Sequence, residues 1–145
     1  MSFSPTITRK IEFDSAHRVM NHESKCRNLH GHRYVAEITV RASSGDLDQL
    51  GRVIDFSVLK SEIGAWVDEH WDHGCIVHRH DLDLIQLCKT NNWKCFLLWD
   101  NPTAENMASY LLEKCADLMY PHGIEVMCIR LYETPNCWAE VVNKL

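Results

Sequence analysis

Two stretches near the start of the chain alternate apolar and polar residues. Over residues 5–14, apolar positions such as Ile11 and Phe13 are separated by charged or hydroxyl side chains. Over residues 33–42, five apolar or aromatic residues share one face: Tyr34, Ala36, Ile38, Val40 and Ala42. A period of two residues is typical of a strand with one buried face. The pattern therefore predicts two strands early in the chain, with a turn over residues 43–50 after the second.

Two longer segments, residues 56–70 and 103–119, repeat their apolar residues every three or four positions, which is typical of amphipathic helices. The second segment has the clearer stripe: Met107, Ala108, Leu111, Leu112, Cys115, Leu118 and Met119. Shorter patterns predict a helix over residues 81–89 and strands over residues 94–99, 124–133 and 137–142. The chain thus opens and closes with strands and carries its helices between them.

This order of elements indicates an α+β protein in which helices pack on one face of an antiparallel sheet. The 145 residues suit one compact domain, and we expect a single domain over residues 1–145. A small sheet has edge strands whose backbone groups must be paired or covered. We therefore expect the protein to form homo-oligomers through its sheet edges.

The composition narrows the class of partner. A net charge of −5 disfavours nucleic acid, because duplex binding normally requires an excess of basic side chains. The chain has no apolar run long enough for a membrane span and no signal-peptide core at its start. Its seven cysteines include no Cys-x-x-Cys pair, and we expect most to be buried thiols in a reducing compartment. These features predict a cytoplasmic protein with no nucleic-acid or membrane partner.

Three histidines are candidate ligands of one metal ion. His30 and His32 lie in the segment Cys26-Arg-Asn-Leu-His30-Gly-His32, and residues two apart in a strand point to the same face. His17 ends the preceding strand and can face them if the two strands pair antiparallel. Three imidazoles with a fourth position left open are typical of catalytic Zn²⁺. The pattern predicts such a site; the alternative is a structural zinc site that uses Cys26 as its fourth ligand.

Two other polar groups could take part in proton transfer. Cys26 becomes reactive only if a neighbour promotes its thiolate. Asp72 and His73 could supply that neighbour, because an aspartate beside a histidine fixes the imidazole tautomer; the alternative is a polar turn that ends a helix. A second His-x-His pair, His78 and His80, has no evident third ligand, so we interpret it as a solvated turn.

One carboxylate stands at the end of an apolar face. Glu133 follows a predicted strand face formed by Met127, Ile129 and Leu131. A carboxylate in that position is costly unless it meets hydrogen-bond donors. The paired N–H groups at the edge of a guanidine-like heterocycle would match it; the alternative is a side chain that simply reaches solvent.

Five segments in this order resemble the 6-pyruvoyltetrahydropterin synthase superfamily, over about residues 11–142. They read Phe13-Asp-Ser-Ala-His17-Arg18, Cys26-Arg-Asn-Leu-His30-Gly-His32, Val53-Ile-Asp55-Phe56, Asn101-Pro-Thr103-Ala-Glu105-Asn106 and Leu131-Tyr-Glu133-Thr-Pro135. The pair Asp72-His73 falls in the expected place between them. The resemblance implies the T-fold, an antiparallel four-stranded sheet with helices on one face. In that fold, protomers join edge to edge into barrels and commonly form homohexamers of two trimers.

The resemblance also implies roles for individual residues. It implies a site for Zn²⁺ with three ligands: His17, His30 and His32. Cys26 would be the catalytic base or proton shuttle, and Asp72 and His73 of a neighbouring protomer would complete its triad. Glu133 would anchor the pterin ring, with Thr103 nearby.

The spacing Cys-x₃-His-Gly-His looks like that of the 6-carboxytetrahydropterin synthases of queuosine and deazapurine biosynthesis. The 6-pyruvoyl enzymes place the cysteine farther away, and a third branch carries glutamate near this position. The resemblance therefore implies conversion of 7,8-dihydroneopterin triphosphate to 6-carboxy-5,6,7,8-tetrahydropterin, acetaldehyde and triphosphate. The candidate cations for the triphosphate are Arg18, Lys25 and Arg27, whose alternative role is ordinary surface charge.

Three other functions stay open. The first is 6-pyruvoyltetrahydropterin synthase activity, which eliminates triphosphate only. The second is a non-catalytic, zinc-stabilised pterin-binding module, and the third is aldol cleavage of dihydroneopterin. The segment from Gly74 to Asp100 is longer than in the short bacterial members, so the resemblance does not predict the shape of the pocket rim.

Overall fold

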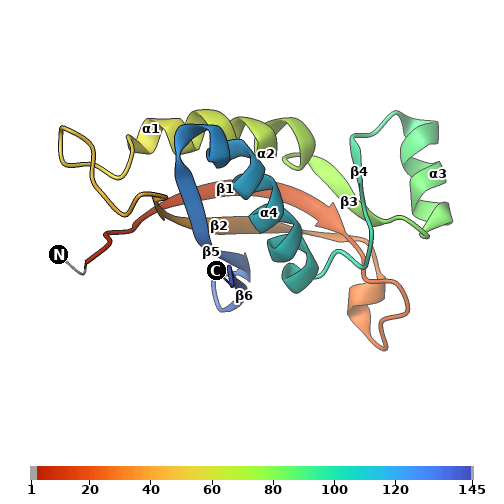
Figure 1. Cartoon of the computed structure of the whole chain (residues 1–145). Helices are drawn as coiled ribbons and strands as arrows, with labels where there is room; N and C mark the ends of the chain where they lie inside the picture. Colours follow the sequence, from red (N-terminus) through yellow and green to blue (C-terminus); the bar gives the residue numbers. More distant parts are fainter. Residues whose placement is uncertain (1–2, 145) are drawn as a thin grey trace.

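The computed structural model describes residues 3–144, whose strands form one mixed sheet (Figure 1). Its six strands lie in the order β4-β3-β1-β2-β5-β6. Their bounds are β1 Ile7–His17, β2 His30–Ala42, β3 Gly74–His78, β4 Cys95–Leu98, β5 Ile124–Thr134 and β6 Cys137–Val142. The helices are α1 Phe56–Leu59, α2 Ala65–His70, α3 Leu82–Asn91 and α4 Ala104–Met119. A π-helical turn at Lys60–Gly64 joins α1 to α2, and 3₁₀ turns occupy Lys25–Arg27 and Tyr120–His122.

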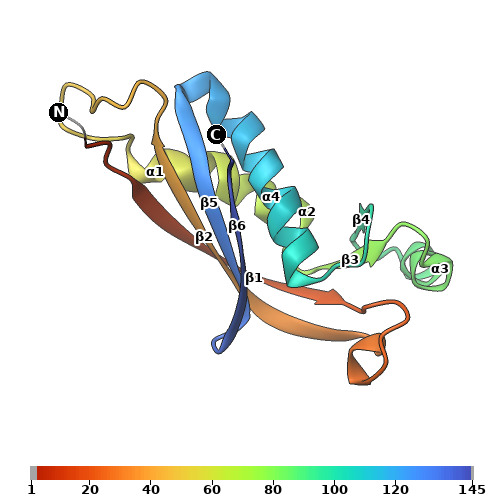
Figure 2. The ribbon, with the colours of Figure 1, turned by 60° about the horizontal axis from the view of Figure 1, so that its bottom comes forward.

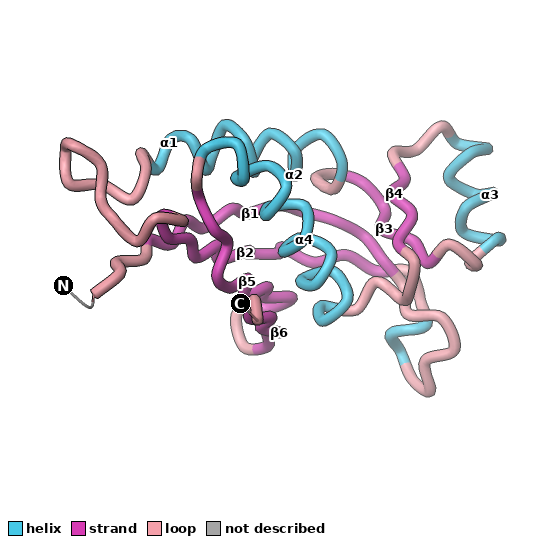
Figure 3. The backbone as a smooth tube through the Cα atoms, in the orientation of Figure 1, coloured by secondary structure: helices cyan, strands magenta, loops and turns pink. Residues whose placement is uncertain are grey.

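The predicted α+β class is confirmed. Helices α1, α2 and α4 lie over the same face of the sheet (Figure 3). Turning the molecule shows how strongly the long strands β1 and β2 curve beneath them, while α3 stands apart beside β3 and β4 (Figure 2). The segment predicted as a helix over residues 56–70 is one continuous helical run, because the π turn keeps its apolar stripe on the sheet.

The prediction of a four-stranded, wholly antiparallel sheet was wrong. Strands β1, β2, β5 and β6 are antiparallel, but β3 pairs parallel with residues Ser15–His17 at the end of β1. Strand β4 then pairs parallel with β3. The sequence pattern predicts β4 but misses β3, because its five residues show no alternation and a short apolar run does not reveal its own structure.

A β-bulge in β5 changes which residues face the core. Thr39 pairs with Cys128 but Val40 pairs with Val126, so Met127 is an extra residue in β5. Val126 is buried and Met127 is not, which corrects the prediction that Met127 shares a face with Ile129. The bulge therefore resets the alternation before the strand reaches Glu133.

The structure corrects one expectation from the composition. Only three of the seven cysteines are buried, namely Cys75, Cys88 and Cys115, so the expectation that most are buried was too broad. Within residues 3–144, every helix is too short or too polar to cross a membrane.

The apolar stripe of α4 packs on the sheet and forms much of the core. Leu111 is completely buried in this layer. Replacing Leu111 by alanine should lower the free energy of unfolding by about 2–5 kcal/mol, because the cavity left behind cannot fully collapse. Urea unfolding measures this loss. The control Leu82→Ala removes a side chain that is 71% exposed and should change stability by less than about 0.5 kcal/mol; equal losses in both variants would contradict this account of the core.

Candidate functional site

The three predicted metal ligands meet at one end of the β1–β2 pair. His17 lies directly opposite His30 in the antiparallel register, and His32 follows two residues later on the same face. The ring centroids are 4.7–5.1 Å apart, and the possible ligand nitrogens all lie within 4.8 Å of one another. Strand β1 runs to His17 and β2 begins at His30, so the sheet itself positions all three side chains.

Hydrogen bonds fix the orientation of two imidazoles. His17 Nδ1 lies 2.6 Å from the carbonyl oxygen of Pro102, and His30 Nδ1 lies 2.6 Å from that of Asn28. A carbonyl oxygen only accepts hydrogen bonds, so each Nδ1 must carry the proton. Each Nε2 therefore keeps a lone pair, which is the arrangement typical of metal-binding histidines.

The buried Nε2 atoms of His17 and His32 have no hydrogen-bond partner among the described residues. Glu133 Oε1 is 3.2 Å from His17 Nε2 and 3.5 Å from His32 Nε2, but without hydrogen-bond geometry. A lone pair that faces a carboxylate oxygen is unfavourable unless a cation lies between them. Burial also lowers the pKa of His32, which keeps that imidazole neutral and able to bind. These donors fit a divalent metal ion.

Two residues that the sequence did not single out support His17. The buried hydroxyl group of Tyr34 lies 3.3 Å from His17 Nδ1, and burial raises the pKa of this phenol. Pro102 provides the carbonyl group described above. Pro102 lies in the motif that runs from Asn101 to Asn106, but a backbone carbonyl leaves no signal in the residue type.

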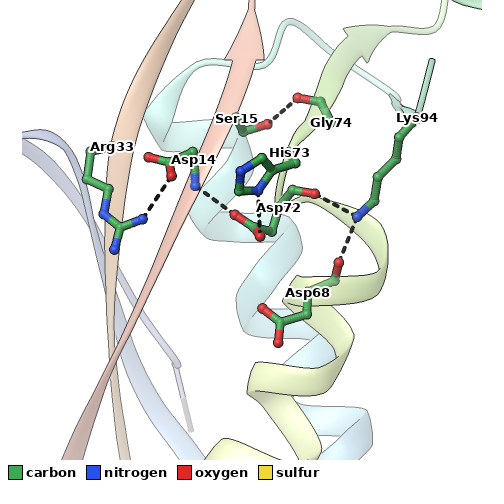
Figure 4. Close-up of polar contacts among 8 residues, drawn as sticks. All are labelled: Asp14, Ser15, Arg33, Asp68, Asp72, His73, Gly74 and Lys94. Carbon is green, nitrogen blue, oxygen red and sulfur yellow. Dashed lines mark hydrogen bonds and ion pairs between the residues drawn. The ribbon is translucent and has the colours of Figure 1, made fainter.

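Asp72 and His73 form a pair in the turn after α2 (Figure 4). His73 Nδ1 lies 2.8 Å from Asp72 Oδ2, and Asp72 Oδ1 accepts a 2.9 Å hydrogen bond from the Asp14 amide. Burial favours the neutral carboxylic acid, but the Asp14 amide, His73 and Lys94 outweigh it and lower the pKa of Asp72. The imidazole of His73 is 77% exposed, so its Nε2 faces outward as an available base.

Cys26 lies in the 3₁₀ turn ahead of β2 and is half-buried. Among residues 3–144, no contact joins it to Asp72 or His73, so one chain does not assemble the predicted triad. His73 is exposed, whereas Cys26 is half-buried.

Glu133 and Thr103 lie around the N-terminus of α4. Thr103 is its N-cap, and Thr103 Oγ1 accepts a 3.2 Å hydrogen bond from the Asn106 amide. Glu133 lines a cavity of about 280 Å³ together with Ala104, Glu105 and residues of β6. The carboxylate therefore lies between the three imidazoles and an open cavity.

The candidate cations separate in the structure. Arg18 forms a two-bond ion pair with the buried Asp81, and its Nε lies 2.6 Å from Asp81 Oδ2. Arg18 and Arg27 line one cavity of about 340 Å³, whereas Lys25 does not line it. His78 ends β3 and His80 lies in the turn that follows, where its amide donates to His78 Nδ1.

Known proteins match this chain over almost its whole length. The family model "6-pyruvoyl tetrahydropterin synthase" matches residues 6–144. The 6-carboxy-5,6,7,8-tetrahydropterin synthase of Rickettsia bellii is 43% identical over 136 residues, covering 92% of this chain and 97% of that protein. The protein of the same name from Haemophilus influenzae is 33% identical, covering 92% and 96%.

Solved structures share the fold. An uncharacterized protein from Wolinella succinogenes matches with a TM-score of 0.83 at 24% identity, covering 97% of this chain and 98% of that one. The Caenorhabditis elegans 6-pyruvoyl tetrahydropterin synthase matches with a TM-score of 0.66 at 27% identity, covering 99% and 100%. A Plasmodium vivax 6-pyruvoyltetrahydropterin synthase in which a catalytic glutamate is replaced by cysteine matches with a TM-score of 0.71 at 20% identity, covering 97% and 99%. The predicted T-fold is thereby confirmed.

Proposed function

This chain belongs to the 6-pyruvoyl tetrahydropterin synthase family, and from that membership we propose that it is a 6-carboxy-5,6,7,8-tetrahydropterin synthase. Two curated relatives, 43% and 33% identical to this chain, carry that name, and the chain matches almost their whole length. The observation that carries the proposal is the cluster of three imidazoles beside Glu133, at Cys-x₃-His-Gly-His spacing. The reaction would convert 7,8-dihydroneopterin triphosphate to 6-carboxytetrahydropterin, acetaldehyde and triphosphate within queuosine biosynthesis.

The resident metal ion would be Zn²⁺, held by Nε2 of His17, His30 and His32. Nitrogen ligands in a set of three support this choice of ion. When bound, the ion supplies a Lewis acid that polarises hydroxyl oxygens of the substrate side chain. Pro102 and Asn28 would hold two of the imidazoles in the tautomer that binding requires.

The chain's own residues would bind the ring and move protons. The carboxylate of Glu133 would accept two parallel hydrogen bonds from the amino and amide edge of the pterin, next to Thr103. Cys26 would transfer protons at the substrate side chain. Its thiol proton would go to Nε2 of His73, whose Nδ1–H is held by Asp72.

Because one chain keeps Cys26 apart from the Asp72–His73 pair, the triad would form between neighbouring protomers. The exposed His73 imidazole and the open edges of β4 and β6 support a homo-oligomer. We therefore propose a homohexamer built from two trimers, with one domain per chain over residues 1–145. Its small-molecule partner would be the pterin triphosphate in the cytoplasm, and nucleic acid and membranes would have no part.

Product analysis tests the proposed reaction. Zinc-loaded protein incubated with 7,8-dihydroneopterin triphosphate should yield 6-carboxytetrahydropterin and acetaldehyde, identified by mass spectrometry. A 6-pyruvoyl product would contradict the branch assignment. Untouched substrate with zinc retained would favour the non-catalytic pterin-binding module. Dihydroneopterin without the triphosphate is the control, and its cleavage would indicate an aldolase.

A further inference from the structure

The turn that carries His73 has a conformation that side chains rarely adopt. His73 has a φ of 56°, in the left-handed region that disfavours residues with a Cβ. Such a conformation persists only where surrounding contacts hold it. The completely buried Trp71 fixes the start of the turn, and the His73 amide donates a 2.7 Å hydrogen bond to Asp14 O. The carbonyl side of the same peptide bond needs a partner of its own.

Lys94 supplies that partner from a distant part of the chain (Figure 4). Its Nζ donates to Asp72 O at 2.6 Å and to Asp68 O at 2.7 Å. The carbonyl of Asp68 lies at the C-terminal end of α2, where helix carbonyls lack a partner in the helix. A cation there also interacts favourably with the helix dipole. One ammonium group thus joins the end of α2 to the peptide bond between Asp72 and His73.

The path of the lysine side chain is built into the fold. A Cβ at Gly74 would lie 3.1 Å from Lys94 Cγ and 3.2 Å from Lys94 Cδ, so a larger residue there would press on the lysine side chain and shift it by a few tenths of an ångström. The carbonyl oxygen of Lys94 accepts a 3.0 Å hydrogen bond from the Cys75 amide, at the start of the β3–β4 pairing. The lysine is therefore fixed at its backbone as well as at its ammonium group.

We propose that Lys94 is a positioning residue that holds the peptide bond between Asp72 and His73 and so aims the His73 imidazole. This inference rests on the proposed catalytic role of the Asp72–His73 pair. It also gives the long 74–100 segment a function, because β3 and β4 bring Lys94 across to the turn. His73, Gly74 and Lys94 line one cavity of about 700 Å³ together with residues 14–16 of β1 and 31–33 of β2, so the lysine holds the pair where an approaching protomer could reach it.

The test replaces Lys94 by methionine, which keeps the length of the side chain and removes its donors. The protein is the full chain loaded with zinc. Without the ammonium group, the imidazole should lose its fixed direction, and kcat should fall about 10- to 100-fold. KM should stay within about twofold, because Glu133 and the metal ligands are untouched. The matched control is Lys89→Met on α3, an exposed lysine of the same segment, which should keep kcat.

A double mutant separates positioning from simple destabilisation. If Lys94 acts through His73, then Lys94→Met should add almost nothing in a His73→Ala background. An equal loss of kcat in both backgrounds, or an unchanged kcat in the single variant, would overturn the proposal. A fall in melting temperature without a fall in kcat would overturn it as well.

A spectroscopic readout keeps the inference separate from the proposed reaction. The Nδ1–H proton of His73, which Asp72 holds, should give a distinct NMR signal in the wild type, assigned by its loss in His73→Gln. That signal should weaken or exchange rapidly in Lys94→Met and persist in Lys89→Met. If the wild type shows no pterin turnover but this pattern appears, Lys94 positions the pair and only the proposed function fails. An unchanged signal in Lys94→Met refutes the positioning role itself.

Discussion

Replacing His17 by alanine will abolish stoichiometric metal binding and, with it, turnover. His17 is 1% exposed, its ring lies 4.7 Å from that of His30 and 5.1 Å from that of His32, and it is held by the Pro102 carbonyl. Its removal leaves two nitrogen ligands, and losing a ligand costs more than the 10- to 100-fold in affinity lost when a ligand's hydrogen-bond partner is removed. We expect zinc affinity to fall more than about 100-fold. Metal analysis after dialysis and competition with a chromophoric chelator measure this change.

His78→Ala is the matched control, because His78 belongs to the other His-x-His pair. Its zinc content should equal that of the wild type. Circular dichroism checks that His17→Ala keeps its secondary structure. If His17→Ala retained one zinc ion per chain at unchanged affinity, the three-histidine site would be refuted for both the enzyme and the binding-module hypotheses.

Replacing Cys26 by alanine will leave zinc bound and lower kcat by about 100- to 10,000-fold, the range for a general acid–base group. Cys26 lies in the turn before β2, outside the group of three imidazoles that could hold a metal. Its loss removes a proton-transfer group and leaves the Nε2 atoms of the histidines in place. Steady-state kinetics and zinc content, measured on the same preparation, test the two halves of this result.

The outcome separates an enzyme from a binding module. In the module hypothesis Cys26 is the fourth ligand, so Cys26→Ala would lose zinc together with any pterin binding. The control Cys128→Ala removes a half-buried thiol from β5 and should keep both zinc and turnover. Unchanged turnover in Cys26→Ala would contradict the proposed proton-transfer role.

The sequence by itself determined the elements whose apolar side chains recur with one regular period. Alternation identified β1 and β2, and the stripe of α4 identified the helix that covers them. The spacing of His30 and His32 placed both on one face, because residues two apart in any strand point the same way. Each of these inferences depends on residues near one another in the chain.

The tertiary structure decided what depends on pairing between distant segments. The register that sets His17 opposite His30 follows from the whole β1–β2 ladder. A shift of one residue in that ladder would turn its buried side chains outward. The bulge at Met127 lies in one ladder only, so alternation within β5 could not reveal it. Strand β3 was missed and the parallel pairing of β3 with β4 was not predicted, since a short apolar run does not reveal which strand lies beside it.

The supporting contacts of the site were the least predictable. Pro102 acts through a carbonyl oxygen, a group that every residue has, and Lys94 acts on carbonyls 22 and 26 residues away. The side-chain types of the site follow from the sequence, because chemistry limits which residues bind a metal or transfer a proton. Their orientation follows from backbone groups, which carry no residue-specific signal until the chain has folded.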